Sequence, residues 1–140
     1  MCLVDNKKFR ISTKPIKVYK MVLEFEHSKR IMSPYKDSPL HKGLNFAGFG
    51  QPIDQSYTVN KEKINAFSFG AGFIHAYEKL KDANDTARRN NIITMICSGY
   101  SYRVVECYIH PFTRYAIEHD YNTDVTTLCS RFLWIGKTVY

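Results

Sequence analysis

The sequence predicts an α+β fold, built as a single antiparallel or mixed β-sheet of five to seven strands with one main helix and one long loop. Three observations predict it. Several segments alternate apolar and polar residues or are rich in β-branched and aromatic residues, only one segment has the period of an amphipathic helix, and residues 33–56 contain three prolines and three glycines. The 140 residues fit one domain over residues 15–140, preceded by a basic arm over residues 1–14.

The first half of the chain is expected to supply two strands and the long loop. The first strand is predicted over residues 16–26, where Tyr19 and alternate residues after it are apolar. A short return strand is expected to end at Pro34. The loop over residues 33–56 is rich in aromatic residues, which favours its packing onto the domain or onto a partner subunit. The segment 57–67 fits a short helix or a strand.

An apolar stripe at helical spacing predicts a helix over residues 78–91. The stripe consists of Leu80, Ala83 and Ala87. Two consecutive asparagines, Asn90 and Asn91, are expected to end the helix.

A β-hairpin is predicted directly after the helix. Its arms are residues 92–98 and residues 101–110, and its two-residue turn is Gly99-Tyr100, because a Gly-X pair is typical of a type II′ turn. Further strands are predicted at residues 73–77, 113–119 and 125–135, the last two joined by a polar turn at residues 120–124.

Two features of the composition bear on function. The chain has 20 Lys and Arg against 13 Asp and Glu, a formal net charge of +7, and aromatic residues make up 14% of it. A positive field attracts anions such as nucleotides, and aromatic rings stack on bases. The same features also suit a basic solvated surface and a β-rich core with aromatic cross-strand pairs, and composition alone does not separate these readings.

Several chemistries lack their sequence motifs. The four cysteines form no C-x-x-C pair and no histidine lies at zinc-ligand spacing, so neither a metal nor another cofactor is expected, and Cys97, Cys107 and Cys129 are predicted to be buried thiols. No H-E-x-x-H, G-x-S-x-G or paired-carboxylate pattern occurs, so the question of catalysis stays open, with a non-catalytic role favoured. The absence of a signal peptide, a long apolar run and a recognition helix predicts a cytoplasmic protein, in the host cytoplasm if a phage encodes it, that binds neither membranes nor duplex DNA.

The segment SFGAGFIHAY, residues 68–77, is the least ordinary stretch of the chain. Gly70 and Gly72 permit a left-handed backbone and a close approach of the backbone to a ligand, and successive N–H groups in such a turn can hold an anion. The spacing matches neither a dinucleotide fingerprint nor a P-loop. On local grounds a simple bend between two elements is favoured over a ligand-binding turn.

The face on which His75 lies depends on its neighbours. If Ile74 and Ala76 point into the core, the opposite side of this strand carries an aromatic and polar face that could stack a base and hydrogen-bond a ribose. That face would consist of Phe73, His75 and Tyr77. A histidine whose ring is satisfied by a backbone carbonyl is the commoner alternative.

Two arginines adjoin tyrosines, Arg103 after Tyr102 and Arg114 before Tyr115. Arginine can hold a phosphate bidentately and stack on a base, so these pairs are candidate ligand contacts. The full set of candidate ligand-binding residues is Tyr19, Lys20, Gly70, Gly72, Phe73, His75, Tyr77, Arg103, Arg114 and Tyr115.

The order of motifs carries a resemblance. The motifs are Val18-Tyr19-Lys20, Ser33-Pro34-Tyr35, the segment 72–77, Lys81-Asp82-Ala83 and the segment 107–111. In this order they resemble a loose group of small uncharacterised phage and bacterial proteins with a central G-F-H-A-Y segment. Here Ile74 is inserted before His75, which moves the histidine to the other face of a strand. The group has no established activity to carry over.

A second similarity is to ADP-ribosyltransferase-like folds, on the aromatic and basic first strand, the glycine-aromatic turn and the alanine-containing helix. It implies an NAD-using enzyme in which a late glutamate orients the ribose. Glu118 is the nearest candidate for that glutamate, although it lacks the flanking Gln/Glu-x-Glu pattern.

Together these features predict a phage or mobile-element protein that forms a homo-oligomer and sequesters an anionic nucleotide-type ligand, with a non-catalytic role favoured. A cyclic dinucleotide or an ADP-ribose derivative fits this description, and its removal would counter host defence signalling. One alternative is an ADP-ribosyltransferase-like enzyme using Tyr19, His75 and Glu118. Another is a host-protein interaction module that uses the loop over residues 33–56.

Overall fold

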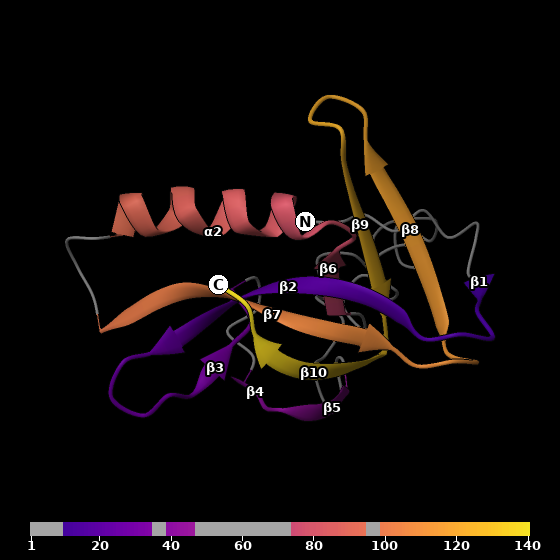
Figure 1. Ribbon diagram of the computed structural model, residues 1–140, viewed down its shortest axis with the longest axis horizontal. Helices are drawn as coiled ribbons and strands as arrows, with labels where there is room; N and C mark the ends of the chain where they lie inside the picture. Colours follow the sequence, from indigo (N-terminus) through magenta and orange to yellow (C-terminus); the bar gives the residue numbers. More distant parts are fainter. Residues whose placement is uncertain (1–9, 35–38, 47–73, 95–98) are drawn as a thin grey trace, which may run out of the picture.

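The computed structural model describes residues 10–34, 39–46, 74–94 and 99–140. Within these residues it contains one ten-stranded sheet and one helix (Figure 1). The strands are β1 Arg10–Ile11, β2 Ile16–Phe25, β3 Ile31–Met32, β4 Pro39–Leu40, β5 Gly43–Phe46, β6 Ile74–Tyr77, β7 Tyr100–Ile109, β8 Arg114–Asp120, β9 Val125–Ser130 and β10 Phe132–Thr138. The helix is α2 Leu80–Thr94.

The two longest strands, β2 and β7, form the centre of the sheet. They pair antiparallel along their whole length, from Ile16 opposite Ile109 to Phe25 opposite Tyr100. The main path of the sheet is β1-β8-β9-β6-β2-β7-β10-β5, and β3 and β4 branch from the end of β2. All pairs of neighbouring strands are antiparallel.

One face of the sheet, here called the inner face, holds the main hydrophobic core. Val18 and Val22 of β2 lie there with Val105 and Cys107 of β7, all fully buried. The same cluster includes residues from strands on either side of this central pair: Ile31 and Leu40 from β3 and β4, Leu128 from β9, and Leu133 and Ile135 from β10. Because residues of these separate strands belong to one cluster, the sheet must curve around this core.

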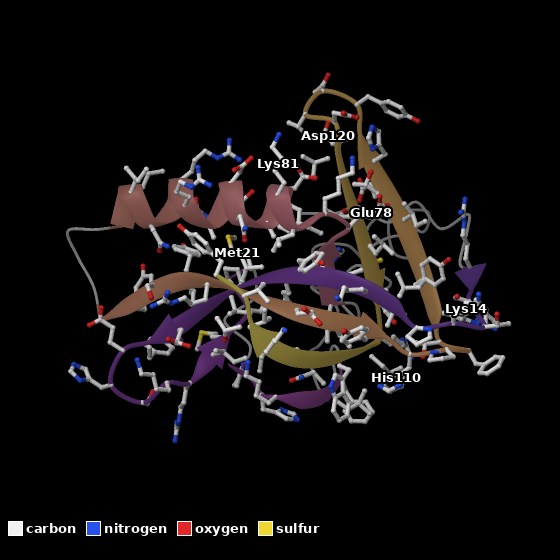
Figure 2. The ribbon with its side chains drawn as sticks, in the orientation of Figure 1. Lys14, Met21, Glu78, Lys81, His110 and Asp120 are labelled. Carbon is white, nitrogen blue, oxygen red and sulfur yellow. The ribbon has the colours of Figure 1, made fainter. Side chains whose placement is uncertain are left out.

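The other face, here called the helix face, is covered in part by α2, which lies along β2 and β7 (Figure 1). Ala83 and Ala87 of the helix are completely buried against Met21 and Val104. Figure 2 shows Met21 between the helix and the sheet. The predicted apolar stripe of the helix is therefore confirmed, and its small alanines allow the helix to approach the strands closely.

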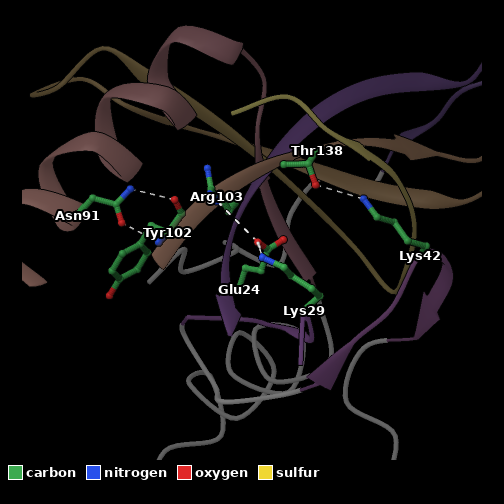
Figure 3. Close-up of polar contacts among 7 residues, drawn as sticks. All are labelled: Glu24, Lys29, Lys42, Asn91, Tyr102, Arg103 and Thr138. Atoms are coloured by element: carbon green, nitrogen blue, oxygen red, sulfur yellow. Dashed lines mark hydrogen bonds and ion pairs between the residues drawn. The ribbon is translucent and has the colours of Figure 1, made fainter. Parts of the chain in front are cut away.

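The C-terminal part of α2 is held to β7 by the side chain of Asn91, which forms the hydrogen bonds that a neighbouring strand would otherwise form. The Asn91 amide donates to the carbonyl oxygen of Tyr102 at 2.9 Å, and the Tyr102 backbone N–H donates to Asn91 Oδ1 at 2.7 Å (Figure 3). These two hydrogen bonds satisfy the backbone of β7 on the side where β10 has not yet joined it, because β10 first pairs with β7 at Val105.

The predicted fold class is wrong. The described chain is mostly β, with ten strands instead of five to seven. Three of the additional strands, β1, β4 and β5, have only two to four residues, and β4 and β5 lie inside the expected loop over residues 33–56, where Pro and Gly are frequent. The short return strand expected before Pro34 is present as β3. Such short strands show no alternation in the sequence, since their pairing depends on the long strands beside them.

The predicted hairpin and the predicted last strand also need correction. Residues 92–94 form the last turn of α2 instead of a strand, and Tyr100 is the first residue of β7 instead of part of a turn. Ile92 and Ile93 are exposed at the end of the helix, although their β-branched side chains had suggested a buried strand. The predicted strand over residues 125–135 is two strands that separate at Arg131.

Other predicted elements are confirmed. The first strand, the short strand at β6, the strand at β8 and the turn after it lie within a residue or two of their expected bounds. Of the expected arm, residues 10 and 11 pair with β8, while residues 1–9 lie outside the described residues, as does the ambiguous segment 57–67.

Replacing Asn91 with alanine is expected to lower the free energy of unfolding by about 1–3 kcal/mol, because both backbone groups of Tyr102 then lose their partner. Urea unfolding of Asn91→Ala, compared with Arg89→Ala on the exposed side of the same helix, measures the effect. Equal midpoints for the two variants would show that the amide does not hold the helix to β7.

Candidate functional site

The structure distributes the predicted ligand-binding residues over several places. Tyr19, His75 and Tyr77 lie on the helix face, Lys20 points into the core, and Arg103, Arg114 and Tyr115 lie elsewhere on the sheet. Gly70, Gly72 and Phe73 are outside the described residues.

His75 lies on the helix face. Ile74 and Ala76 are buried in the inner core, so His75 and Tyr77, at alternate positions of β6, point to the other side. Tyr77 is opposite Tyr19 of β2. The expected polar and aromatic face of this strand therefore exists for its described residues.

Tyr19 and Tyr77 belong to a longer cross-strand row. Tyr19 is opposite Glu106 on one side and Tyr77 on the other, Tyr77 is opposite Thr127, and Thr127 is opposite Glu118. The row thus crosses five strands and has a carboxylate at each end. Tyr19 and Glu118, two residues of the enzyme alternative, are separated by three strand spacings, roughly 14 Å at about 4.8 Å each.

Lys20 is the one buried lysine among the described residues, with 1% of its surface exposed. Its Nζ donates to the backbone carbonyl of His75 at 2.8 Å, which links β2 to β6 from inside the core. Burial lowers the pKa of Lys20 to about 8, since the charged ammonium loses its hydration there. A side chain that was expected to contact a ligand therefore links two strands inside the core.

Arg103 and Arg114 lie in different surroundings. Arg103 Nε is 3.8 Å from Glu24, which also has Lys29 Nζ at 3.9 Å (Figure 3). Arg114 lies on β8 opposite Ile11 of β1. The two arginines therefore do not share one site, and whether either contacts a ligand stays a prediction.

A group of aromatic side chains that sequence reasoning missed lies on the helix face, beyond the residues that pack against α2. One row consists of Lys17, Tyr108 and Trp134, which are opposite one another on β2, β7 and β10. The next row contains Phe132 opposite Phe46. Together with His110, at the end of β7, these residues are here called the aromatic surface: Lys17, Phe46, Tyr108, His110, Phe132 and Trp134.

The rings of the aromatic surface are in contact and partly exposed to solvent. The ring centroids of Phe46 and Phe132 are 5.0 Å apart and those of His110 and Trp134 are 5.8 Å apart, both edge to face. Phe46 is 56% exposed and Trp134 is 43% exposed. Edge-to-face packing holds such rings in fixed positions. The signal in the sequence was the spacing of two in Tyr108-x-His110 and Phe132-x-Trp134, which puts each pair on one face of a strand.

A polar cluster borders these rings. The Tyr108 hydroxyl donates to Glu106 at 2.6 Å, and Lys17 Nζ is 3.5 Å from the same carboxylate and 5.9 Å from the centre of the Tyr108 ring. The hydrogen bond from Tyr108 keeps the pKa of Glu106 below its ordinary value, and the attraction of Glu106 raises the pKa of Lys17. The cluster thus holds an ammonium group beside an aromatic ring at neutral pH.

Among the described residues, no group of three or more His, Cys, Asp or Glu side chains is arranged so that it could hold a metal ion. Cys107 and Cys129 are buried and not in disulfides, and burial raises the pKa of each thiol to about 12. The prediction of buried thiols is confirmed for these two cysteines, while Cys2 and Cys97 lie outside the described residues. In the described part of the chain, α2 is neither long nor apolar enough to cross a membrane.

Comparison with protein-family models, with curated proteins and with solved structures finds no match. Function is therefore inferred from the chemistry of the described side chains.

The buried Lys20 predicts a particular dependence of stability on pH. The folded protein releases the Lys20 proton at about pH 8, whereas the unfolded chain keeps it to about 10.5, so the unfolded state binds more protons in between. The free energy of unfolding should therefore rise between pH 8 and pH 10.5, by roughly 3 kcal/mol at about 1.4 kcal/mol per unit of pKa.

Urea unfolding of the wild type and of Lys20→Met across this pH range isolates that contribution, because tyrosine ionisation affects both proteins alike. The wild-type curve should rise relative to the variant as the pH increases. Parallel curves would mean that Lys20 titrates in the folded protein as it does in water.

Proposed function

We propose that this protein binds an anionic nucleotide-type ligand on the aromatic surface. The observation that supports it is the row Lys17–Tyr108–Trp134, which places an ammonium group beside the Tyr108 ring and a partly exposed indole on the next strand. A base would stack on the rings, and Lys17 would pair with a phosphate.

The surface suits a base because its rings are both exposed and fixed. Two edge-to-face contacts and the hydrogen bond of Tyr108 to Glu106 restrict the rings before a ligand arrives. A preorganised surface loses less side-chain entropy on binding than a flexible one does, which favours affinity. The net charge of +7 adds long-range attraction for an anion.

The biological role that fits such binding is sequestration of a signalling nucleotide, for example a cyclic dinucleotide or an ADP-ribose derivative, by a phage or mobile-element protein. Binding between two subunits and a role in countering host defence belong to the same proposal. A ligand that is recovered unchanged after the protein is denatured supports storage, whereas a cleaved ligand or released nicotinamide supports the enzyme alternative.

The protein contains a single tryptophan, Trp134, so its fluorescence reports on the proposed site alone. Titration with AMP, ADP-ribose and cyclic dinucleotides is expected to quench this fluorescence with saturation for at least one of them, because the base stacks on the indole. The absence of any quenching up to millimolar ligand would contradict the proposal.

Two lysine variants form a matched pair for this titration. Lys17 and Lys29 are both exposed and both pair with a glutamate, Lys17 with Glu106 and Lys29 with Glu24. Lys17→Gln is expected to weaken binding about tenfold, which corresponds to about 1.4 kcal/mol, and Lys29→Gln to leave it unchanged. If Arg103→Ala abolishes binding and Lys17→Gln does not, the ligand binds on the other side of the sheet.

A further inference from the structure

Two residues after His110 of the aromatic surface, the chain carries an exposed phenylalanine in a strained backbone conformation. Phe112, in the turn between β7 and β8, has a φ of 64° and is 74% exposed. A left-handed backbone is unfavourable for a bulky side chain, and an exposed ring gains little from packing in return. This combination indicates a ring that is held outward for a partner.

The turn that carries Phe112 is fixed to its surroundings. The Phe112 N–H donates to the carbonyl of Ser12 at 2.8 Å, and the Thr113 N–H donates to the carbonyl of His110 at 3.3 Å. The turn is thus tied both to the segment after β1 and to a residue of the aromatic surface. Figure 2 shows His110 and Lys14 at this end of the molecule.

Basic side chains accompany these rings. Lys17 lies in the first row, Arg131 directly precedes Phe132, and Arg114 follows the turn with Phe112. Lys14 is two residues from Ser12, which binds the turn. All four cations are exposed. The three strands that carry the first row span roughly 10 Å at about 4.8 Å per spacing, which one nucleotide can cover. Phe112 and Arg114 come after the end of β7, outside this row, so a longer ligand is needed to reach them.

We infer that the ligand of this surface is a single-stranded nucleic acid, whose successive bases stack on Trp134, Phe132 and Phe112 while its phosphates meet the four cations. This inference rests on the proposed nucleotide binding and extends it to a polymer. Stacking of bases on successive aromatic side chains beside a basic groove is the general mode of sequence-tolerant single-strand binding. A duplex cannot bind in this way because its bases are paired and stacked on each other.

Binding of a twelve-residue oligothymidylate, of the dinucleotide dTpdT and of a hairpin duplex of the same length is compared by quenching of Trp134 fluorescence. The oligonucleotide is expected to bind at least about fivefold more tightly than the dinucleotide and than the duplex, because about 1 kcal/mol is the low end of what one additional stacked base contributes. Its affinity should fall with salt, with a log–log slope of roughly −3 for four phosphate contacts.

The results separate this inference from the proposed function. Equal affinity for the oligonucleotide and the dinucleotide, or a duplex that binds as well as the single strand, overturns the inference and leaves nucleotide binding intact. No quenching by any of the three and none by the mononucleotides overturns both.

Replacing Phe112 with glycine gives a sharper test, because its effects on stability and on binding have opposite signs. Glycine accepts the left-handed backbone, so the melting temperature of Phe112→Gly should be no lower than that of the wild type. Its affinity for the oligonucleotide should fall about tenfold, whereas its affinity for dTpdT should not change.

Asp124→Gly is the matched control, since Asp124 also has a left-handed backbone, with a φ of 57°, but lies in the turn between β8 and β9. It should bind the oligonucleotide as the wild type does. Wild-type affinity in Phe112→Gly, or an equal loss in both variants, contradicts a role for Phe112 in binding.

Discussion

The long antiparallel pairing of β2 with β7 is the interaction on which the rest of the structure depends. Both strands have ten residues, and every residue of one is opposite a residue of the other. On the inner face this ladder supplies Val18, Val22 and Val105 to the main core, and on the helix face it supplies Met21 and Val104 to the contact with α2. Since both faces are buried near the middle of the ladder, the apolar residues there are consecutive instead of alternating.

The position of α2 on this ladder determines which part of the sheet stays open. The helix follows β6 and packs on the half of the ladder that contains Met21 and Val104, where the small Ala83 and Ala87 allow close contact and Asn91 fixes the far end. Among the described residues, Lys17 and Tyr108 in the other half do not belong to the cluster that packs with the helix, and Trp134 beside them is partly exposed. An incompletely covered sheet face with aromatic side chains is a common form of binding surface.

The sequence was a good guide to long elements and a poor guide to pairing. It predicted the first strand and the apolar stripe of the helix, because both depend on local periodicity. It misassigned Ile92 and Ile93, whose β-branched side chains suit a strand but lie at the exposed end of a helix that Asn91 fixes through tertiary hydrogen bonds. Lys20 was listed as a candidate ligand contact, and since a lysine is rarely buried, nothing local indicates that its ammonium donates a hydrogen bond to the His75 carbonyl inside the core. The aromatic surface is formed by β2, β7, β10 and β5, which are distant in the sequence, so only the registers of these strands reveal it.

The central claim is that the ligand lies on the side of the sheet that α2 leaves open, across β7 and β10. Photocrosslinking with an azido-nucleotide, followed by mass spectrometry of the tryptic peptides, tests this most directly because it locates the base without relying on a mutation. Crosslinks should occur on the peptides that contain Tyr108 and Trp134 and should disappear when unlabelled nucleotide competes. Competable crosslinks confined to α2 or to the strand end around Glu24 and Arg103 would contradict the claim.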